Sequence, residues 1–392
     1  MSDTLYLGID WGTHSSKWVW ARGARAEFKI LRSEVRLDND HLLLSADAPP
    51  SGSVFMGGLK KQLINNPSTP FWGGLQRGMR LSLGELFAFS LWRLMSEAYA
   101  AAPRVASKQP DLLEIRFSLP NWVDIDSGAV GRATYEQAAR VACNIFVADR
   151  TSWVQEQQPR RLVWQKRVSR ALDELGISDD LPIDHHPQGF RTLLKQECKI
   201  NDNTRFRFVA ESSAAGLTGL LRSDQEDALG VLKILVVDVG AGSTDIGYLL
   251  KTKQALCQLP PANTCQIAGE NLSRRILDIY RSRGRQISFD EAELIKTTGS
   301  ETGWRKHPTV KDWINAIADH VREYVSVVTD KRWLPYQPGL FVFVTGGSGV
   351  VPGLDKALLD ATIDGLRSQK ISATVRGTKG LTIALRGPLA AR

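Results

Sequence analysis

The sequence predicts a mixed α/β protein in which a strand–turn–strand hairpin occurs twice. In residues 233–250, an apolar run ends at Asp238, a glycine-rich turn follows, and a second apolar run begins after Asp245. In residues 5–20, an apolar run ends at Asp10, a short turn follows, and a strand returns from Lys17. Apolar runs bounded by glycine-rich turns are typical of hairpins, and helical spacing of apolar residues elsewhere adds the α component.

The turn of the second hairpin has the residue types of a phosphate-binding loop. It consists of Gly240, Ala241, Gly242, Ser243 and Thr244. Glycine lets the backbone approach a ligand and present bare N–H groups to it, and the hydroxyls add donors. The flanking carboxylates suit the hydration shell of Mg²⁺ rather than phosphate itself. Taken alone, the same turn also fits an ordinary glycine-rich hairpin.

Two further turns make a ligand-binding interpretation stronger. The first hairpin carries Gly12, Thr13 and His14 in its turn, and residues 340–354 run from a buried strand into Gly346, Gly347 and Ser348. Two similar hairpins far apart in the chain indicate an internal duplication that closes on one ligand.

These three stretches, in this order, resemble the two phosphate motifs and the adenosine motif of the actin, heat-shock chaperone and sugar kinase superfamily. The pattern is most similar to the nucleotide-binding domain of the seventy-kilodalton heat-shock chaperones. The resemblance implies a two-lobed, actin-like ATPase with duplicated ribonuclease H-like domains and a nucleotide cleft between the lobes. It implies ATP and Mg²⁺ as cofactors and slow hydrolysis coupled to lobe closure.

The resemblance also implies domain boundaries. Residues 1–226 form lobe I, with a helical insertion at about 149–205 that is longer than the connection in the chaperones. Residues 227–373 form lobe II with a reduced outer subdomain, and 374–392 form a C-terminal helix that returns to lobe I.

Roles for individual residues follow from the matched motifs. Lys60 stands where the chaperones carry their catalytic lysine, and Glu211 stands near the attacking water. Asp10, Asp238 and Asp245 would hold Mg²⁺ through water, with Asp238 also counted among the catalytic residues. The resemblance implies these nucleotide-binding residues: Gly12, Thr13, His14, Gly240, Ala241, Gly242, Ser243, Thr244, Gly269, Glu293, Lys296, Ser300, Gly346, Gly347 and Ser348.

Several positions depart from the chaperone pattern. Val350 and Thr297 replace the two cations that stack on the adenine, which leaves the preferred base open. Lys17 resembles the phosphate-contacting lysine of actins, so it either joins Lys60 or replaces it. His14 stands where the family has a hydroxyl residue; it offers either a pH-sensitive donor or only its backbone N–H.

Composition sets outer limits on function. The chain has 392 residues, 43% of them hydrophobic, and a net charge of +8. We expect no membrane segment, no signal peptide and four scattered buried thiols, which together suit a cytoplasmic protein. The basic charge allows a nucleic acid or an acidic partner, but the nucleic acid is not favoured because no nucleic-acid fold motif is present.

The remaining elements follow in chain order. Residues 22–44 read as strands, 45–53 and 65–78 as loops, and 115–119 as a strand. Ser82 and Glu85 form a capping box before a helix whose apolar stripe is Leu86, Phe89, Trp92 or Arg93, and Met95. Residues 131–146 read as another helix.

The long connection holds an amphipathic helix at residues 160–175, with Leu162, Val168, Leu172 and Leu175 on one side. It reads as a solvated helix packed on lobe I, with a partner-binding or nucleic-acid-binding insertion as the alternative. The adjacent His185 and His186 do not share a face, so we expect no metal there. Arg274, Arg275, Arg281, Arg283 and Arg285 read as a solvated basic face.

Four functions fit this sequence. The first is a chaperone-like nucleotide switch that lacks its own substrate-binding domain and acts with a protein partner or client. The second is a filament-forming bacterial actin, which Lys17 favours and which the long insertion and the chaperone-like Lys60 loop disfavour. A small-molecule kinase and a nucleotide sensor with little hydrolysis complete the set; the assembly state is open.

Overall fold

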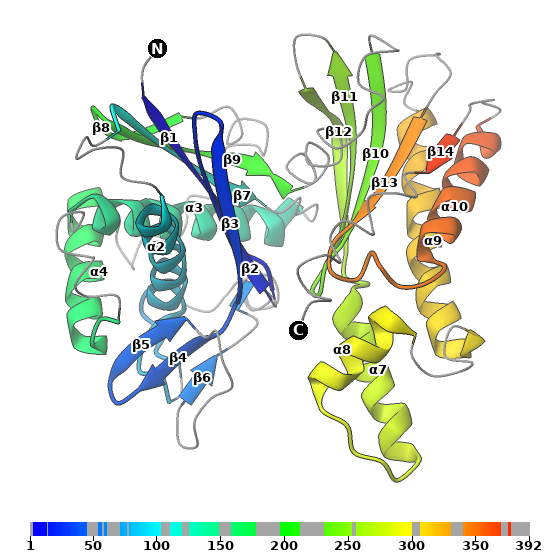
Figure 1. Ribbon diagram of the computed structural model, residues 1–392, viewed down its shortest axis with the longest axis horizontal. Coiled ribbons are helices and arrows are strands. Elements are labelled where there is room, and N and C mark those ends of the chain that lie inside the picture. Colours follow the sequence, from blue (N-terminus) through cyan, green and yellow to red (C-terminus); the bar gives the residue numbers. More distant parts are fainter. Residues whose placement is uncertain are drawn as a thin grey trace. The chain divides into compact units, whose positions relative to one another are not determined.

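The computed structural model describes residues 3–13, 15–44, 54–56, 59–60, 71–76, 78–102, 110–119, 125–148, 158–177, 197–211, 231–252, 256–299, 306–330, 340–369 and 375–377. These residues contain seven helices and fourteen strands (Figure 1), which confirms the predicted mixed α/β class. The chain divides into two compact units, unit 1 (Met1–Ala210) and unit 2 (Glu211–Arg392).

Unit 1 is organised around a six-stranded sheet in the order β3-β2-β1-β7-β9-β8. The first three strands form an antiparallel meander, and β7 and β9 continue the sheet parallel to β1. The strands are β1 (Thr4–Asp10), β2 (Ser15–Arg22), β3 (Arg25–Arg32), β7 (Leu112–Leu119), β8 (Glu197–Asn201) and β9 (Thr204–Ala210).

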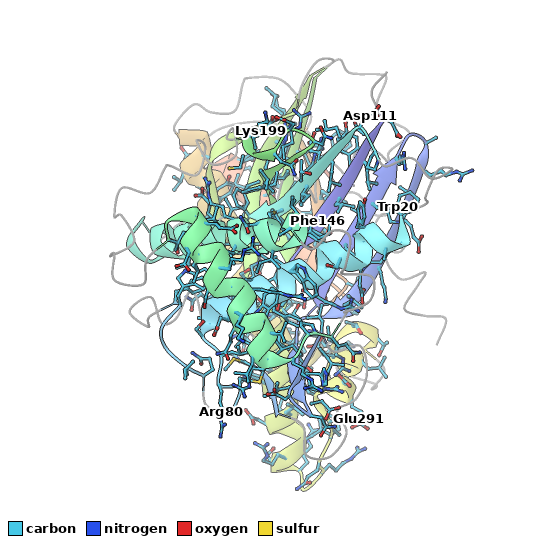
Figure 2. The ribbon with its side chains drawn as sticks, turned by 90° about the vertical axis from the view of Figure 1, so that its left-hand side faces the viewer. Trp20, Arg80, Asp111, Phe146, Lys199 and Glu291 are labelled. Atoms are coloured by element: carbon cyan, nitrogen blue, oxygen red, sulfur yellow. The ribbon has the colours of Figure 1, made fainter. Side chains whose placement is uncertain are left out.

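Three helices, α2 (Leu83–Ala101), α3 (Ile125–Ala148) and α4 (Arg161–Leu175), build the core of unit 1. The predicted capping box is confirmed: the Ser82 hydroxyl accepts from the Glu85 N–H, and the Glu85 carboxylate accepts from the Ser82 N–H. In the predicted stripe of α2, Leu86, Phe89, Trp92 and Met95 are fully buried, so Trp92 rather than Arg93 takes the stripe position that the sequence left open. Figure 2 labels Trp20 of β2 and Phe146 of α3, both of which belong to this core.

The helix α4 packs on α2 and α3 through only half of the predicted stripe, because Val168 is buried and Leu172 is partly buried against the core. Its buried residues are Trp164, Val168 and Ala171, whereas Leu162 and Leu175 are exposed. The reason is the Trp164 ring, which lies 5.5 Å from Phe89 and so sets the rotation of the helix. The 149–205 range also supplies strand β8 to the main sheet, so it is not wholly helical.

A small second sheet in unit 1 anchors the start of α4. Its strands are β4 (Val35–Asp38), β5 (His41–Leu44) and β6 (Val54–Met56), in the order β5-β4-β6. Asn39 and Asp40 connect β4 to β5 with φ of 45° and 64°, as tight hairpin turns require. The Asp40 carbonyl accepts from the Arg161 N–H at 2.8 Å, and its carboxylate pairs with the Arg161 Nε at 2.9 Å.

Unit 2 contains a five-stranded sheet in the order β12-β11-β10-β13-β14. The strands are β10 (Val231–Val239), β11 (Thr244–Thr252), β12 (Leu256–Cys265), β13 (Leu340–Thr345) and β14 (Val375–Gly377). The helices are α7 (Gly269–Ser282), α8 (Phe289–Thr298), α9 (Pro308–Asp330) and α10 (Leu354–Ser368). The core forms where alternate residues of β10, such as Leu235 and Val237, meet apolar residues of α7, α9 and α10.

The two sheets share one strand order. In each sheet, three consecutive strands form an antiparallel meander. Two further strands then extend the sheet on the side of the meander's first strand and run parallel to it: β7 and β9 beside β1 in unit 1, and β13 and β14 beside β10 in unit 2. The duplication predicted from the two hairpins is therefore present in the topology of the whole sheets.

Near its C-terminus, the described chain differs from the predicted secondary structure. Residues 375–377 form strand β14 beside β13, whereas the sequence predicted a helix over 374–392. Residues 378–392, the loop at 45–53, and His185 and His186 lie outside the described residues. Arg274, Arg275, Arg281, Arg283 and Arg285 are all exposed, as predicted.

Candidate functional site

In the first hairpin, two side chains hold Asp10. The Ser118 hydroxyl donates to one carboxylate oxygen at 2.6 Å, and the Lys17 ammonium lies 3.3 Å from the other. Asp10 and Lys17 are directly opposite each other in the β1–β2 ladder, so their side chains share a sheet face. Both are partly open to solvent, with 37% of the Asp10 side chain and 50% of the Lys17 side chain exposed.

A second lysine influences the same carboxylate. Lys60 is 5% exposed, and its charge acts on Asp10 together with that of Lys17. Burial would raise the pKa of Asp10, but the Lys17 and Lys60 charges and the Ser118 hydrogen bond outweigh it, so the pKa lies below its ordinary value. The structure thus brings both predicted lysines to the acid that ends β1.

The turn of the first hairpin needs glycine at Gly12. A Cβ there would collide with the Ser15 carbonyl oxygen. The second hairpin repeats this contact, because a Cβ on Gly240 would lie 3.1 Å from the Ser243 carbonyl oxygen. Thr13 is part of the described turn, whereas His14 lies outside the described residues.

The second hairpin has two acids at the positions where the first hairpin has an acid and a lysine. Asp238 and Asp245 are directly opposite each other in the β10–β11 ladder, on the sheet face opposite the core residues Leu235 and Val237. Asp245 is buried and accepts hydrogen bonds from Ser243 at 3.0 Å and from Thr264 at 2.6 Å. Position 245 therefore corresponds to position 17 of the first hairpin, with the opposite charge.

The turn between these acids is held by its carbonyl groups. The Gly240 and Ala241 carbonyls accept from the N–H groups of Gly269 and Glu270, which begin α7, each at 2.9 Å. Within the described residues, the backbone N–H groups of Ala241, Gly242 and Ser243 make no hydrogen bond. A run of unused N–H groups is the feature by which such turns bind anions.

Thr244 has a different role from its neighbours in the turn. It is fully buried, and its hydroxyl donates to the Ile267 carbonyl at 2.6 Å. This hydroxyl therefore ties β11 to the segment before α7, and we assign it no contact with a ligand.

The third glycine turn packs directly against the second hairpin. Gly346 has φ of +88°, and a Cβ there would collide with the Asp238 carboxylate and the Val239 carbonyl. The Ser348 N–H donates to the same Val239 carbonyl at 3.0 Å. At Gly347, by contrast, a Cβ would meet nothing within 4 Å.

Four predicted site residues from three segments of unit 2 meet in one place. A Cβ on Gly269 would collide with the Ser348 hydroxyl and would lie 2.9 Å from the Lys296 Nζ. Lys296 is 1% exposed and pairs with Glu293 at 2.6 Å, and Glu293 also accepts from the Ser273 hydroxyl. Burial lowers the pKa of Lys296, against the pull of the Glu293 charge.

The Thr297 hydroxyl donates within its own helix, to the Glu293 carbonyl at 3.0 Å, and Val350 is half-buried. Glu211 directly follows β9, whose carboxyl end lies at the same sheet edge as that of β1. Ser300 lies outside the described residues.

Sequence reasoning missed four supporting residues: Ser118, Thr264, Ser273 and Trp313. The Trp313 indole N–H donates to the Ala268 carbonyl at 2.9 Å, which fixes the start of α7. Ser118 could have been found, because parallel neighbouring strands bring their carboxyl ends to one edge. No local signal marks the other three, since each acts across a long sequence separation.

The second hairpin fits a hydrated Mg²⁺ ion. Within the described part of the chain, no group of three or more histidine, cysteine, aspartate or glutamate side chains could hold a metal directly. Mg²⁺ commonly keeps several waters and uses one or two carboxylates plus substrate phosphates. Asp238 and Asp245 are a carboxylate pair of this kind.

Comparison with known proteins identifies no family. No family model matches the sequence, and no curated protein matches it. Among solved structures, the chain is similar to a non-polymerising MamK mutant bound to AMPPNP, at 15% identity and a TM-score of 0.49, over 98% of this chain and 96% of that chain. Among the described helices, none has the length and apolar character needed to cross a membrane.

Proposed function

We propose that this chain is an actin-like ATPase that binds ATP with Mg²⁺ and hydrolyses it slowly as a conformational switch. The observation that carries the proposal is the turn of the second hairpin, where three unused backbone N–H groups lie beside two carboxylates. The repeated strand order supports it, because the same hairpin occurs at the same place in both sheets.

In unit 2, the N–H groups of Ala241, Gly242 and Ser243 bind phosphate oxygens. Asp238 and Asp245 hold waters of the metal, which neutralises phosphate charge when bound. Gly346 allows the third turn, which is the proposed adenosine-binding turn, to lie directly against Asp238. The residues proposed to bind adenosine therefore pack against those proposed to bind phosphate and metal. Glu293 and Lys296 stand on the adenosine side.

In unit 1, the turn at Gly12 and Thr13 supplies further N–H groups, and Lys17 and Lys60 offset the charge that develops during phosphoryl transfer. Lys17 pairs with Asp10. Because this ion pair is partly exposed it is weak, so the Lys17 ammonium can leave Asp10 and bind a phosphate oxygen instead. Glu211, which directly follows β9, orients the attacking water.

The base is a separate part of the proposal. Thr297 and Val350 provide no cation to stack on adenine, so cation stacking contributes neither affinity nor discrimination at the base. We expect ATP and GTP to bind with affinities within about tenfold of each other, since one stacked cation contributes about 1 kcal/mol.

The decisive experiment compares ATP hydrolysis and binding in the wild type, Glu211→Ala and Asp238→Ala. We expect Glu211→Ala to retain ATP binding and lose hydrolysis, and Asp238→Ala to lose the Mg²⁺ dependence of binding. Equal hydrolysis rates in all three proteins would contradict the proposal.

A filament-forming ATPase is the second candidate, because Lys17 occupies the place of the phosphate-contacting lysine of actins. Sedimentation and electron microscopy with ATP separate the two. Nucleotide-dependent filaments would favour this candidate, and a dispersed protein with a nucleotide-dependent protein partner would favour the switch.

A further inference from the structure

The outermost strand of the unit 1 sheet is unusually open. β3 pairs with β2 along one edge, and no described strand pairs with its other edge. All residues from 25 to 30 are exposed, so both faces of this strand reach solvent. Phe28 is 57% exposed and Ile30 is 40% exposed, which is high for apolar side chains on a strand.

Open edges of this kind are templates for pairing with another strand, and proteins usually block them. β3 contains no proline, and its register with β2 is continuous from Arg25 to Arg32, without a bulge. The one protective feature is charge. Arg25, Glu27 and Lys29 alternate with Ala26, Phe28 and Ile30 along the strand, so one face is charged and the other is apolar.

The order of these charges is self-complementary. If two copies of β3 pair antiparallel about Phe28, each residue faces the one equally far on the other side of Phe28. Glu27 then lies opposite the partner's Lys29, Lys29 opposite the partner's Glu27, and Phe28 opposite the partner's Phe28. The two symmetric ion pairs and the aromatic pair each favour this register.

Neighbouring registers lack this match. Pairing about Glu27 would put glutamate opposite glutamate and Arg25 opposite the partner's Lys29. Pairing about Lys29 would put lysine opposite lysine. Like charges directly opposite each other destabilise a ladder, so the charge pattern disfavours both of these registers. Pairing about Ala26 would also match charges, Arg25 with the partner's Glu27, but it would put alanine opposite alanine, so the pair of Phe28 rings favours the register centred on Phe28.

We propose that β3 pairs antiparallel with β3 of a second copy of this chain, joining two six-stranded sheets across a twofold axis. The interface is the same surface on both copies, so this contact closes as a dimer and does not by itself propagate into a filament. The inference is independent of nucleotide binding, because β3 carries none of the residues assigned to ATP.

The contacts of β3 within its own chain allow this pairing. Lys29 lies 3.5 Å from Glu97 of α2 and is 51% exposed, which makes a weak surface ion pair that can rearrange. On the apolar face, Phe28 is directly opposite Val19 of β2, which is itself 39% exposed. The paired Phe28 rings therefore extend an apolar surface already present on the neighbouring strand.

The test is a charge-reversal cycle followed by analytical ultracentrifugation over a range of concentrations. The single variants Glu27→Lys and Lys29→Glu each place like charges opposite each other twice per dimer. We expect each to weaken dimerisation by about tenfold or more. The double variant restores both pairs, and we expect it to dimerise like the wild type.

A mixture of the two single variants gives the sharpest outcome. Each variant alone is expected to dimerise weakly, but together they carry opposite charges at both facing positions, so we expect a one-to-one heterodimer. Arg25→Glu is the matched control, because Arg25 faces the partner's Leu31 in this register and its reversal leaves dimerisation unchanged. Circular dichroism confirms that each variant is folded.

Two results would overturn the inference. One is a wild-type chain that stays monomeric at all concentrations tested. The other is a dimer whose strength is unchanged by both single reversals. Asp238→Ala, which disables the proposed nucleotide site, should dimerise normally, so failure of one proposal is distinguishable from failure of the other.

Discussion

Replacing Trp164 by alanine tests whether α4 belongs to the cooperative core of unit 1. The Trp164 side chain is fully buried, with its ring 5.5 Å from that of Phe89 and 5.4 Å from that of Trp92. Its indole N–H donates to the Glu85 carbonyl, in the first turn of α2, at 2.9 Å. One side chain therefore provides both the packing and a polar tie to α2.

The expected magnitude follows from these contacts. Truncating a buried tryptophan to alanine lowers the free energy of unfolding by about 3–5 kcal/mol, and the lost hydrogen bond adds about 1 kcal/mol. For a unit of this size, each 1 kcal/mol lowers the melting temperature by about 2–4 °C. We therefore expect the unit 1 transition to fall by about 8–24 °C.

Scanning calorimetry, with hydrogen exchange to assign each transition, measures this change. Leu162→Ala is the control on the same helix, because Leu162 is 56% exposed and its truncation should change stability by less than about 0.5 kcal/mol. An unchanged unit 1 transition in Trp164→Ala would refute the reasoning. It would mean that α4 is attached to unit 1 without stabilising it.

The remaining predictions concern the two hairpins. Lys17→Met should raise the pKa of Asp10, because burial is then opposed only by Lys60 and Ser118. The pKa of Asp10 is lower in the folded state, so ionised Asp10 stabilises the fold at pH values above its unfolded pKa of about 3.9. This stabilisation is lost as pH falls through the folded-state pKa, and Lys17→Met should have less of it to lose. NMR titration of the Asp10 carboxyl carbon measures this shift, and an identical titration in wild type and variant would contradict the proposed charge balance. Gly346→Ala should lower the free energy of unfolding of unit 2 by about 2 kcal/mol or more, because a side chain at φ of +88° is strained and would strike Asp238 and Val239. Denaturant unfolding measures the loss; Gly347→Ala, which has open space around it, is the control, and equal losses in the two variants would count against the close approach.

Much of the fold was predictable because its signals are local. Both hairpins, the capping box at Ser82 and the buried stripe of α2 depend on residues a few positions apart. Hydrophobic periodicity and turn chemistry act at that range, so they can be read directly from the chain.

Other features required long-range packing. The buried face of α4 was predicted only in part: Val168 and Leu172 contact the core, but Leu162 and Leu175 are exposed although they fit the apolar side by periodicity. The large ring of Trp164 packs against the rings of Phe89 and Trp92, and this contact places the Trp164 face of α4 in the core. Strand β14 lies in the range 374–392, which the family resemblance implied to be a helix. Residues 375–377 instead form a strand because they pair with β13, a contact that no local signal marks.

The sequence by itself determined the two aspartate-tipped hairpins, their glycine turns and the seven-residue spacing from Asp10 to Lys17 and from Asp238 to Asp245. Only the tertiary structure decided what that spacing means, since antiparallel pairing places the two residues of each pair side by side on one sheet face. It also decided that Ser118 and Lys60 act on Asp10 while Ser243 and Thr264 hold Asp245. The physical reason is distance: the chemistry of each residue type is inherent in the chain, but the partner of each charge is chosen by strands and helices that meet far apart in sequence.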